Sequence, residues 1–353
     1  VSAIVLDSQN NNDANTSQQD TIYVDNKIEQ PVCDNYAIEL RRCSGGAATA
    51  FRSLSDAANS ADAGKTVLIR QGVYEQALVP SHSGIPGKPI IFKNYPAEEV
   101  TITGLLLKPA VDISGHKYIV IEGLNISNVM RWMYLREAHY NIIKNNKFYK
   151  ALDGDGGSKT GLYIASSSYN KVLHNSFEDN PSDSLSIVNS DRNLIDGNSF
   201  RKAEHSLWAI RCGNYNVIRG NNFHNSEQKI GEVYDCDGQS GVNKYDATKY
   251  NIIENNDFTF VPSSGNHSAY SGIQFAGQNS IIRHNRFHDT VGPGLRMALY
   301  GDEAAINAEN RIYNNVFYGT HFAGVDINTG NREHIMYDNV FKNNIFMKSK
   351  FVA

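Results

Sequence analysis

A short unit of apolar and polar residues recurs along most of the chain. Each copy has a pair of aliphatic or β-branched residues, then an asparagine, and a phenylalanine two positions after that asparagine. A short β-branched run followed by a turn residue is typical of a strand and a corner, not of a helix. The copies end at Phe148, Phe177, Phe200, Phe223, Phe258, Phe287, Phe317 and Phe341, and a weaker copy spans residues 118–126.

The spacing of the copies separates a basic coil from its loops. Successive phenylalanines lie 29, 23, 23, 35, 29, 30 and 24 residues apart, so the shortest interval of 23 is one bare coil. A second apolar stretch lies between each phenylalanine and the next copy, for example at residues 161–166 and 184–189. Coils stacked about 4.8 Å apart would bring identical residues into ladders of bonded asparagines and packed phenylalanine rings. The pattern therefore predicts an all-β fold, a right-handed parallel β-helix built as a solenoid.

The N-terminal part has a different pattern. Residues 1–20 are polar and predict a flexible lead. Residues 21–353 predict a single β-helix domain, with a cap at about 21–65 and coils at about 66–350. Within the cap we expect a strand at residues 21–26 and a short amphipathic capping helix at residues 49–61. Such a helix would cover the open end of the stack and protect an exposed sheet edge from aggregation.

The balance of charge narrows the class of partner. The chain has 33 basic and 37 acidic residues, a net charge of -4, which argues against nucleic acid. A local basic cluster can still bind a charged sugar. No stretch approaches the ~18 uninterrupted apolar residues that a membrane span needs. No signal-peptide pattern opens the sequence, so we expect a mature or trimmed form, acting as a monomer.

The four cysteines fall into two kinds. Cys33 and Cys43 lie ten residues apart in a polar segment and predict a disulfide. Cys212 and Cys236 occupy comparable points of successive repeats, so they can be stacked neighbours, bridged or free. No C-x-x-C pair occurs, which argues against a zinc site. A disulfide in the cap implies an oxidising compartment, and we therefore expect a secreted protein, extracellular or periplasmic.

Side chains able to do chemistry gather on the second apolar stretch of the middle coils. Residues alternate between core and surface along a strand, and we take the aliphatic residue near the start of each stretch as inward. Insertions before and after this stretch predict loops that wall a groove. The outward candidates are Trp208, Arg211, Glu232, Tyr234, Asp235, Asp237, Gln274, Arg296 and Asp326; His205 and Lys229 open two of the strands, and Lys244, Tyr245 and Asp246 follow in a loop.

Two reaction classes fit these side chains. A lyase acting on a uronate needs a cation or metal to stabilise enolate-like charge, and a base for the proton next to the carboxylate. A glycosidase instead needs two carboxyl groups that flank the scissile bond. The lyase candidates are Arg211 or Arg296 for the charge and Tyr234, His205 or Lys244 for the base; the glycosidase candidates are Glu232 with Asp235 or Asp237.

The remaining candidates would bind substrate or metal. Trp208 would be a platform on which a sugar stacks in either class. Clustered oxygens of Asp235, Asp237 and Asp246 predict a calcium site, which makes Ca²⁺ the expected cofactor. The further substrate-binding candidates are Lys229, Lys244, Tyr245, Gln274 and Arg296.

Purely structural interpretations remain open for several of these residues. Glu232 and Arg211 on neighbouring coils can form a salt bridge across the stack. Asp235 and Asp237 can be turn residues where a strand ends. His205 can be an ordinary loop residue, and Trp208 can pack against a loop.

The lead-in at residues 49–104 and the repeats that follow resemble the pectate-lyase-like superfamily of right-handed β-helices, whose members include polysaccharide lyases, glycoside hydrolases, epimerases and phage tailspikes. Residues 210–223, IRCGNYNVIRGNNF, are similar to the coil of chondroitinase B-like and alginate lyases that carries a catalytic arginine, which the resemblance places at Arg211. The preceding coil departs from that family, because Asn189 stands where the family has its base lysine. Ser182 and Ser184 stand where it has calcium-binding acids.

Together these observations predict a polysaccharide lyase that cleaves an acidic, uronate-containing glycan by β-elimination. The alternatives are a glycoside hydrolase that uses a carboxylate pair on the same surface, and a non-catalytic carbohydrate-binding or tailspike-like solenoid.

Overall fold

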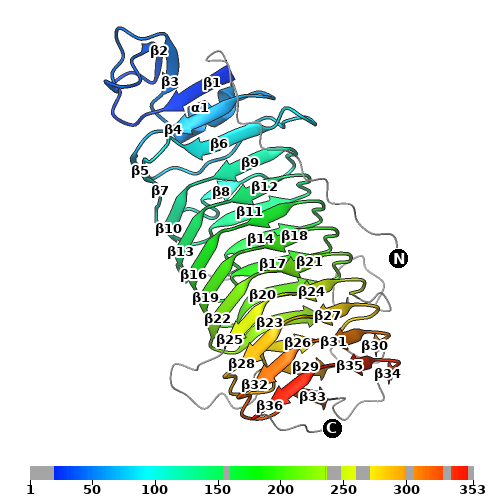
Figure 1. Ribbon diagram of the computed structural model, residues 1–353. Coiled ribbons are helices and arrows are strands. Elements are labelled where there is room, and N and C mark those ends of the chain that lie inside the picture. The colour runs from blue at the N-terminus through cyan, green and yellow to red at the C-terminus, as the bar shows by residue number, and fades with distance from the viewer. Residues whose placement is uncertain are drawn as a thin grey trace.

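The chain folds into a stack of coils that runs from an N-terminal cap to the C-terminal strands (Figure 1). The computed structural model describes residues 20–153, 160–234, 236, 248–259, 271–298, 306–328 and 335–348. Strands from successive coils pair side by side into three long sheets of 14, 11 and 9 strands. Among the described residues, the strand pairings within these sheets are parallel except the one between β2 and β3. The architecture is the predicted parallel β-helix.

Within each sheet the strands follow one another along the stack. The fourteen-stranded sheet contains β2 (Val32–Tyr36), β3 (Ala48–Phe51), β1 (Thr21–Val24), β4 (Thr66–Ile69), β6 (Ile90–Asn94), β9 (Ile119–Glu122), β12 (Ile142–Lys144), β15 (Lys171–Leu173), β18 (Leu194–Asp196), β21 (Val217–Arg219), β24 (Ile252–Glu254), β27 (Ile281–Arg283), β31 (Arg311–Tyr313) and β35 (Val340–Lys342). The eleven-stranded sheet contains β36 (Ile345–Met347), β32 (Val316–Tyr318), β28 (Arg286–His288), β25 (Asp257–Thr259), β22 (Asn222–Ser226), β19 (Ser199–Ala203), β16 (Ser176–Asn180), β13 (Lys147–Ala151), β10 (Asn125–Val129), β7 (Val100–Ile102) and β5 (Gly72–Tyr74). The nine-stranded sheet contains β33 (Val325–Asn328), β29 (Leu295–Ala298), β26 (Ile273–Phe275), β23 (Lys229–Tyr234), β20 (Ser206–Arg211), β17 (Leu185–Val188), β14 (Leu162–Ala165), β11 (Met133–Arg136) and β8 (Val111–Asp112). A small sheet of 2 strands pairs β30 (Ile306–Ala308) with β34 (Ile335–Tyr337).

One coil visits the three long sheets in turn. From β14 the chain passes to β15 in the fourteen-stranded sheet, then to β16 in the eleven-stranded sheet, and returns as β17 beside β14. Leu162 pairs with Leu185, and Phe177 pairs with Phe200, so equivalent residues of successive coils lie directly beside one another. The second apolar stretch of the sequence is therefore the strand of the nine-stranded sheet, as predicted.

Ladders of identical residues hold the coils together. The Asn198 side chain accepts hydrogen bonds from the backbone N–H of Asn175 at 2.8 Å and from its side-chain amide at 3.1 Å. Its own amide donates to the carbonyl of Val172 at 2.9 Å and to the side chain of Asn221 at 3.0 Å. Each such bond contributes about 1 kcal/mol, and leaving one of these buried groups unpaired costs more than that. The asparagines therefore stabilise the corners, as their recurrence predicted.

The phenylalanine rings stack inside the core, with one correction to the predicted repeat. Ring centroids of Phe177 and Phe200 lie 4.5 Å apart, and the column continues to Phe317 and Phe346 at 5.0 Å. The repeat pattern places Phe341 at the end of this column, but Phe341 pairs with Ile312 in the fourteen-stranded sheet. The coils have two ladder positions five residues apart, both asparagine in most coils and Ser280 with Asn285 in one, and the predicted last copy aligns the first of them, Asn339, with the second of the other coils. The residue of that coil in the second ladder is Asn344, while Asn339 continues the first ladder as the acceptor of Asn310.

The cap is mostly strand. β1 pairs with both β3 and β4, and the cap's own apolar cluster includes Tyr23, Cys33 and Tyr36. The predicted helix at residues 49–61 is shorter than expected: residues 49–51 belong to β3, and α1 spans Leu54–Ser60. Ser53 caps α1 by accepting the N–H of Asp56, and the apolar face of the helix packs into the main core. The predicted disulfide between Cys33 and Cys43 is present. The predicted flexible lead falls almost wholly outside the described residues.

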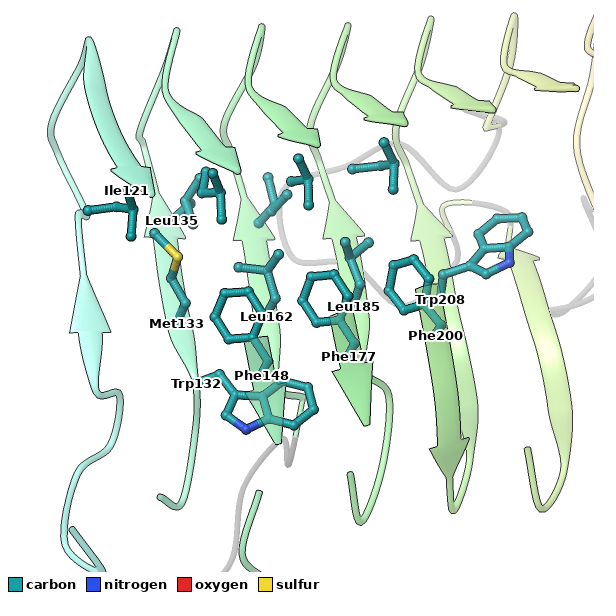
Figure 2. Packing of buried hydrophobic residues seen from close by; sticks show 14 of the residues in the cluster. Ile121, Trp132, Met133, Leu135, Phe148, Leu162, Phe177, Leu185, Phe200 and Trp208 are labelled. Carbon is teal, nitrogen blue, oxygen red and sulfur yellow. The ribbon is translucent and has the colours of Figure 1, made fainter. Parts of the chain in front are cut away.

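Two tryptophans occupy the core beside the phenylalanine column (Figure 2). Trp132 and Trp208 are both fully buried. A Cβ atom on Gly161 would lie 2.3 Å from the Trp132 ring, and one on Gly231 would lie 2.3 Å from the Trp208 ring. Each indole therefore needs a glycine in the following coil, because no side chain fits beside it. In the part of the chain that the structure describes, no helix is both long and apolar enough to span a membrane.

Candidate functional site

The outward face of the nine-stranded sheet carries two columns of side chains, because residues alternate between core and surface along each strand. The strand register sets both columns. The first column runs Asp112, Tyr134, Tyr163, Ser186, Ala209, Glu232, Gln274, Arg296 and Asp326. The second column begins Arg136, Ala165, Val188, Arg211 and Tyr234.

Trp208 does not belong to this face, and its predicted role as a sugar-stacking platform is wrong. The repeat pattern aligns Leu207 with Leu185, whereas in the structure Trp208 pairs with Leu185 and Ala209 takes the outward position. Leu207 and Trp208 are both fully buried. Burial of adjacent residues at the start of β20 hides the alternation on which the prediction relied. The indole instead packs against the Phe223 ring, with centroids 5.9 Å apart.

Glu232 is the centre of the candidate site. Its carboxylate is fully buried, although it occupies an outward position of β23, and it contacts the Lys229 ammonium and accepts a hydrogen bond from the Tyr234 hydroxyl. The His205 Nδ1 atom lies 3.9 Å from the same carboxylate. Burial lowers the pKa of Lys229 to about 8, and the negative charge of Asp183 acts in the opposite direction. A buried carboxylate is stable only when such charged and hydrogen-bonding neighbours surround it.

Asp183 holds His205 in place and is absent from the candidates that the sequence suggested. The Asp183 carboxylate lies 2.7 Å from His205 Nδ1 and also accepts hydrogen bonds from Ser206 at 2.5 Å and Ser186 at 3.2 Å. Burial alone would raise the pKa of Asp183, but these hydrogen bonds and the histidine charge outweigh it and lower the pKa. The sequence did contain a signal for this contact, because Asp183 precedes His205 by about one coil and residues one coil apart lie side by side. His205 is thus fixed by a carboxylate and is not an ordinary loop residue.

Arg211 packs on Tyr234 and does not pair with Glu232. Its guanidinium carbon lies 4.7 Å from the centroid of the Tyr234 ring, which belongs to the next coil. Among the described residues Glu232 pairs with Lys229 and lies near His205, so the alternative interpretation of a salt bridge between Arg211 and Glu232 is wrong. The guanidinium of Arg211 is therefore held beside the Glu232 cluster by a ring and not by a carboxylate.

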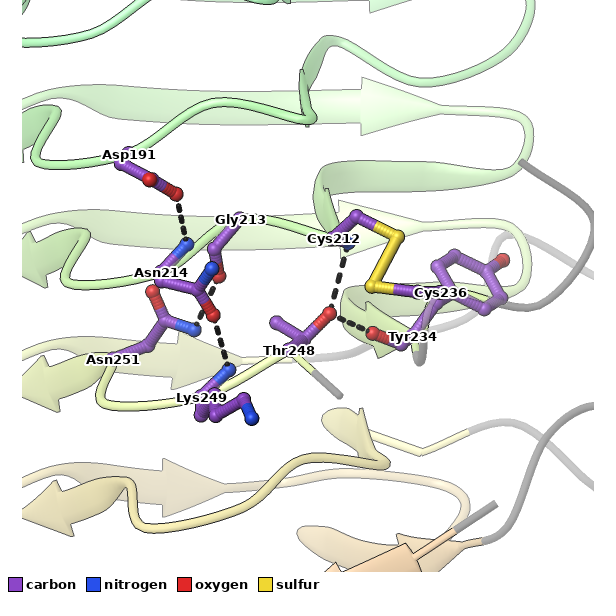
Figure 3. The surroundings of a disulfide bond; sticks show 9 residues. All are labelled: Asp191, Cys212, Gly213, Asn214, Tyr234, Cys236, Thr248, Lys249 and Asn251. Carbon is purple, nitrogen blue, oxygen red and sulfur yellow. Dashed lines mark hydrogen bonds between the residues drawn. A yellow bond between two sulfur atoms is a disulfide. The ribbon is translucent and has the colours of Figure 1, made fainter. Parts of the chain in front are cut away.

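The strand ends that carry Arg211 and Tyr234 are joined covalently. Cys212 follows Arg211 directly and forms a disulfide with Cys236 (Figure 3), which answers the question that the sequence left open. The Thr248 hydroxyl accepts the Cys212 N–H at 2.9 Å and donates to the carbonyl of Tyr234. These contacts fix the two neighbouring strands at the edge of the candidate site.

Further along the face, the other candidates separate. Gln274 pairs with Glu232 across the coils and is partly exposed. Arg296 Nε lies 2.7 Å from the Asp326 carboxylate, so Arg296 is engaged in an ion pair two coils from Glu232. Asp235, Asp237, Lys244, Tyr245 and Asp246 lie outside the described residues. The predicted calcium site therefore stays a prediction, and in the described ranges no three histidine, cysteine or acidic residues gather to hold a metal ion.

The departures from the alginate lyase pattern can also be located. Ser182 and Ser184 flank Asp183, and Ser184 is fully buried. Asn189 directly follows β17 and has a left-handed backbone, φ 48°, and its side-chain oxygen is buried without a hydrogen-bond partner among the described residues. Any base on this face must therefore come from a different position than in that family.

Comparisons with known proteins agree on the fold. A family model described as a right-handed β-helix region matches residues 109–238. YwoF of Bacillus subtilis, an uncharacterized protein, is 41% identical over 85 residues, which span 22% of this chain and only 18% of that protein. The structure of a family 6 polysaccharide lyase from Pseudopedobacter saltans aligns with a TM-score of 0.56 and 16% identity over 84% of this chain and 83% of that chain. A family 136 lacto-N-biosidase from Eubacterium ramulus aligns with a TM-score of 0.55 and 11% identity over 93% and 68%.

At these identities the structural likeness shows the fold alone. The chain is a right-handed parallel β-helix, which is the fold that the resemblance to the pectate-lyase-like superfamily implied. The chemistry of the site rests on its own residues: a histidine held by a carboxylate, a buried Lys–Glu–Tyr cluster, and an arginine on the tyrosine ring. This set offers a base, an acid and a cation within neighbouring coils.

Proposed function

We propose that this protein is a secreted carbohydrate-active enzyme that cleaves an acidic polysaccharide by β-elimination on the outward face of its nine-stranded sheet. The observation that carries the proposal is the Asp183–His205 pair beside the Glu232 cluster. Two disulfides support a location in an oxidising compartment. The lyase and the glycosidase that share the fold support a carbohydrate substrate.

His205 is the proposed base. Its Nδ1 lies 2.7 Å from the Asp183 carboxylate, so this nitrogen carries the proton and Nε2 keeps a free lone pair. Within the described residues Nε2 has no hydrogen-bond partner, and the side chain is 33% exposed. Nε2 can therefore take the proton from the carbon next to the carboxylate of a uronate. Asp183 also stabilises the imidazolium that forms.

Arg211 and Tyr234 complete the proposed reaction. The Arg211 guanidinium neutralises the uronate carboxylate, which increases the acidity of the adjacent carbon and stabilises the enolate-like charge. The electron pair of the broken C–H bond forms the new C=C bond, and the C–O bond to the leaving sugar breaks. The Tyr234 hydroxyl donates its proton to the leaving oxygen. In the structure that proton is donated to Glu232, so the hydroxyl rotates from Glu232 to the leaving oxygen before the transfer, and Lys229 balances the charge of Glu232. The proton that His205 has taken then returns to Tyr234 and restores the enzyme.

A glycoside hydrolase is the second candidate, on one specific observation. Asp183 and Glu232 are two carboxylates that both lie near His205 Nδ1, at 2.7 and 3.9 Å. A hydrolase requires a pair of carboxyl groups about 5–9.5 Å apart. In this structure the nitrogen of His205 is hydrogen-bonded to Asp183 and lies near Glu232, so the two carboxylates hold a histidine base. A reaction that uses a histidine base, the lyase, is therefore the preferred proposal.

A panel digest distinguishes the candidates. The protein would be incubated with alginate, polygalacturonate, glycosaminoglycans and neutral glycans, with and without a chelator, and followed at 235 nm and by a reducing-sugar assay. A rise at 235 nm with an acidic polymer supports the lyase, and its loss with chelator supports the predicted calcium. New reducing ends without absorbance would contradict β-elimination and support the hydrolase. Silence in both channels would contradict an enzyme acting on these polymers and favour a binding solenoid.

A further inference from the structure

A second cluster lies on the same outward face, toward the N-terminal end of the stack. Tyr134 and Tyr163 are neighbours in the first column, with ring centroids 5.7 Å apart at an interplanar angle of 55°. Both side chains are partly exposed. The sequence pattern indicated no candidate residues in this part of the face, and only the strand register brings the cluster together.

Two arginines share these rings. The guanidinium carbon of Arg131 lies 4.3 Å from the Tyr134 centroid, and that of Arg136 lies 5.1 Å from it and 5.9 Å from the Tyr163 centroid. The Nε atom of Arg131 donates to the carbonyl of Thr160 at 3.1 Å. Arg136 is exposed and belongs to the second column. We call the cluster of Arg131, Tyr134, Arg136 and Tyr163 the aromatic–arginine patch.

The patch holds excess positive charge. In the described part of the chain neither arginine is in an ion pair with a carboxylate. Asp112 precedes Tyr134 in the first column, but its carboxylate accepts the Ser114 N–H at 3.0 Å. Burial and the neighbouring charge of Arg136 together lower the pKa of Arg131. Two like charges over one ring repel each other, and a bound anion would relieve that repulsion.

We propose that the aromatic–arginine patch is a distal subsite that binds an acidic sugar residue of the polysaccharide held at the candidate site. The guanidiniums match a carboxylate or sulfate, and the tyrosine rings match the C–H face of a pyranose. This inference rests on the proposed function only for its assumption that the ligand is an acidic glycan.

The surface between the two clusters suits an extended chain. Tyr163 and Glu232 are separated by three coil steps, or roughly 14 Å. Between them the first column has only Ser186 and Ala209; in the second column Val188 lies beside Ser186 and Arg211 lies beside Ala209. Ser186 and Ala209 are each only 5% exposed, so a ligand would lie over this stretch and over the side chains beside it. A glycan aligned with the columns would then contact the patch with one sugar while another lies beside His205 and Arg211, the partly exposed members of the candidate site.

Binding can be measured without any reaction. We would follow the full chain by affinity electrophoresis in gels that contain alginate, polygalacturonate or chondroitin sulfate, with a neutral glycan gel as reference. The variants are Arg136→Gln and Tyr163→Ala. The matched controls are Arg201→Gln and Tyr149→Ala, an exposed arginine and tyrosine on the eleven-stranded sheet. We expect an acidic polymer to retard the wild type, with about tenfold weaker binding in each patch variant and no change in the controls.

Two results would overturn the subsite: equal retardation of patch and control variants, or no retardation of the wild type by any acidic polymer. Failure of the proposed reaction gives a different result. If the wild type shows no absorbance at 235 nm but the patch variants alone lose binding, the reaction is contradicted and the subsite is supported. If the reaction does occur, Tyr163→Ala should raise the KM for polymer. It should leave the cleavage of oligosaccharides too short to reach the patch unchanged.

Discussion

Inward positions of the eleven-stranded sheet and outward positions of the nine-stranded sheet follow opposite rules in this molecule. Inside, one phenylalanine occupies the same position in every coil from Phe148 to Phe346, with neighbouring rings nearly parallel. Outside the nine-stranded sheet, the first column changes from aromatic to small, then to charged residues from coil to coil. In the ladders, identity itself stabilises, because each side chain packs on or bonds to its own kind.

The difference teaches where to look for function in a solenoid. Nothing in stacking explains a buried glutamate beside a lysine, or two arginines on one ring, at single coils. These departures from repetition cost free energy unless neighbours or a ligand compensate them. Four predictions test whether repetition carries stability and whether variation carries activity.

The largest effect is expected where variation is strongest, at His205. His205→Ala removes the proposed base and should lower the rate of product formation by about a thousandfold. The matched control is His224→Ala, a partly buried histidine on β22 in the eleven-stranded sheet. Absorbance at 235 nm under saturating polymer measures both. Equal activity in the two variants would remove His205 from the mechanism.

The repeated core should respond in stability and not in chemistry. Phe223→Ala deletes a fully buried ring that stacks between Phe200 and Phe258. We expect the free energy of unfolding to fall by about 4 kcal/mol. Tyr149→Ala, on the surface, should change it by less than about 0.5 kcal/mol. Denaturant unfolding followed by circular dichroism checks both, and comparable losses would break the distinction between the two faces.

A smaller loss in the free energy of unfolding is expected at Gly231, where the absence of a side chain leaves space for the Trp208 ring of the preceding coil. A Cβ on Gly231 would lie 2.3 Å from the Trp208 ring, so Gly231→Ala should destabilise the fold by about 2 kcal/mol. In a Trp208→Leu background the same substitution should be nearly neutral, because the clashing ring is gone. The double-mutant cycle is measured by chemical unfolding. An unchanged penalty in both backgrounds would mean that the glycine serves another purpose.

The mildest prediction concerns pH. Burial lowers the pKa of Lys229 to about 8 from an ordinary value of 10.5, so the ammonium is present below pH 8 and is lost above it. Glu232 then loses its counter-charge, and activity should fall about tenfold per pH unit above 8. Lys229→Arg stays charged throughout this range and should abolish the decline. The pH–rate profiles of both proteins at 235 nm provide the measurement; identical alkaline limbs would exclude this role for Lys229.

Much of the fold was predictable, and part of the site was not. The strands of the nine-stranded sheet lie where the apolar stretches indicated them, and Glu232, Gln274 and Arg296 occupy the expected outward column. Trp208 was assigned to the wrong face because a slip of one residue between coils exchanges inside and outside. Asp183 was overlooked because an aspartate in a loop has no periodicity, and its significance depends on His205 one coil later.

By itself, the sequence determined the coil, its length and its ladders, since these arise from residues that recur at a fixed spacing and stack on their own kind. Only the tertiary structure decided the contacts that occur once: Asp183 with His205, Lys229 with Glu232, and Arg131 and Arg136 on shared tyrosine rings. In a repeat, the same residue type recurs at the same spacing in every coil, so the sequence indicates the same contact many times. A contact that occurs once depends instead on register, side-chain direction and burial, which become fixed only when the coils stack.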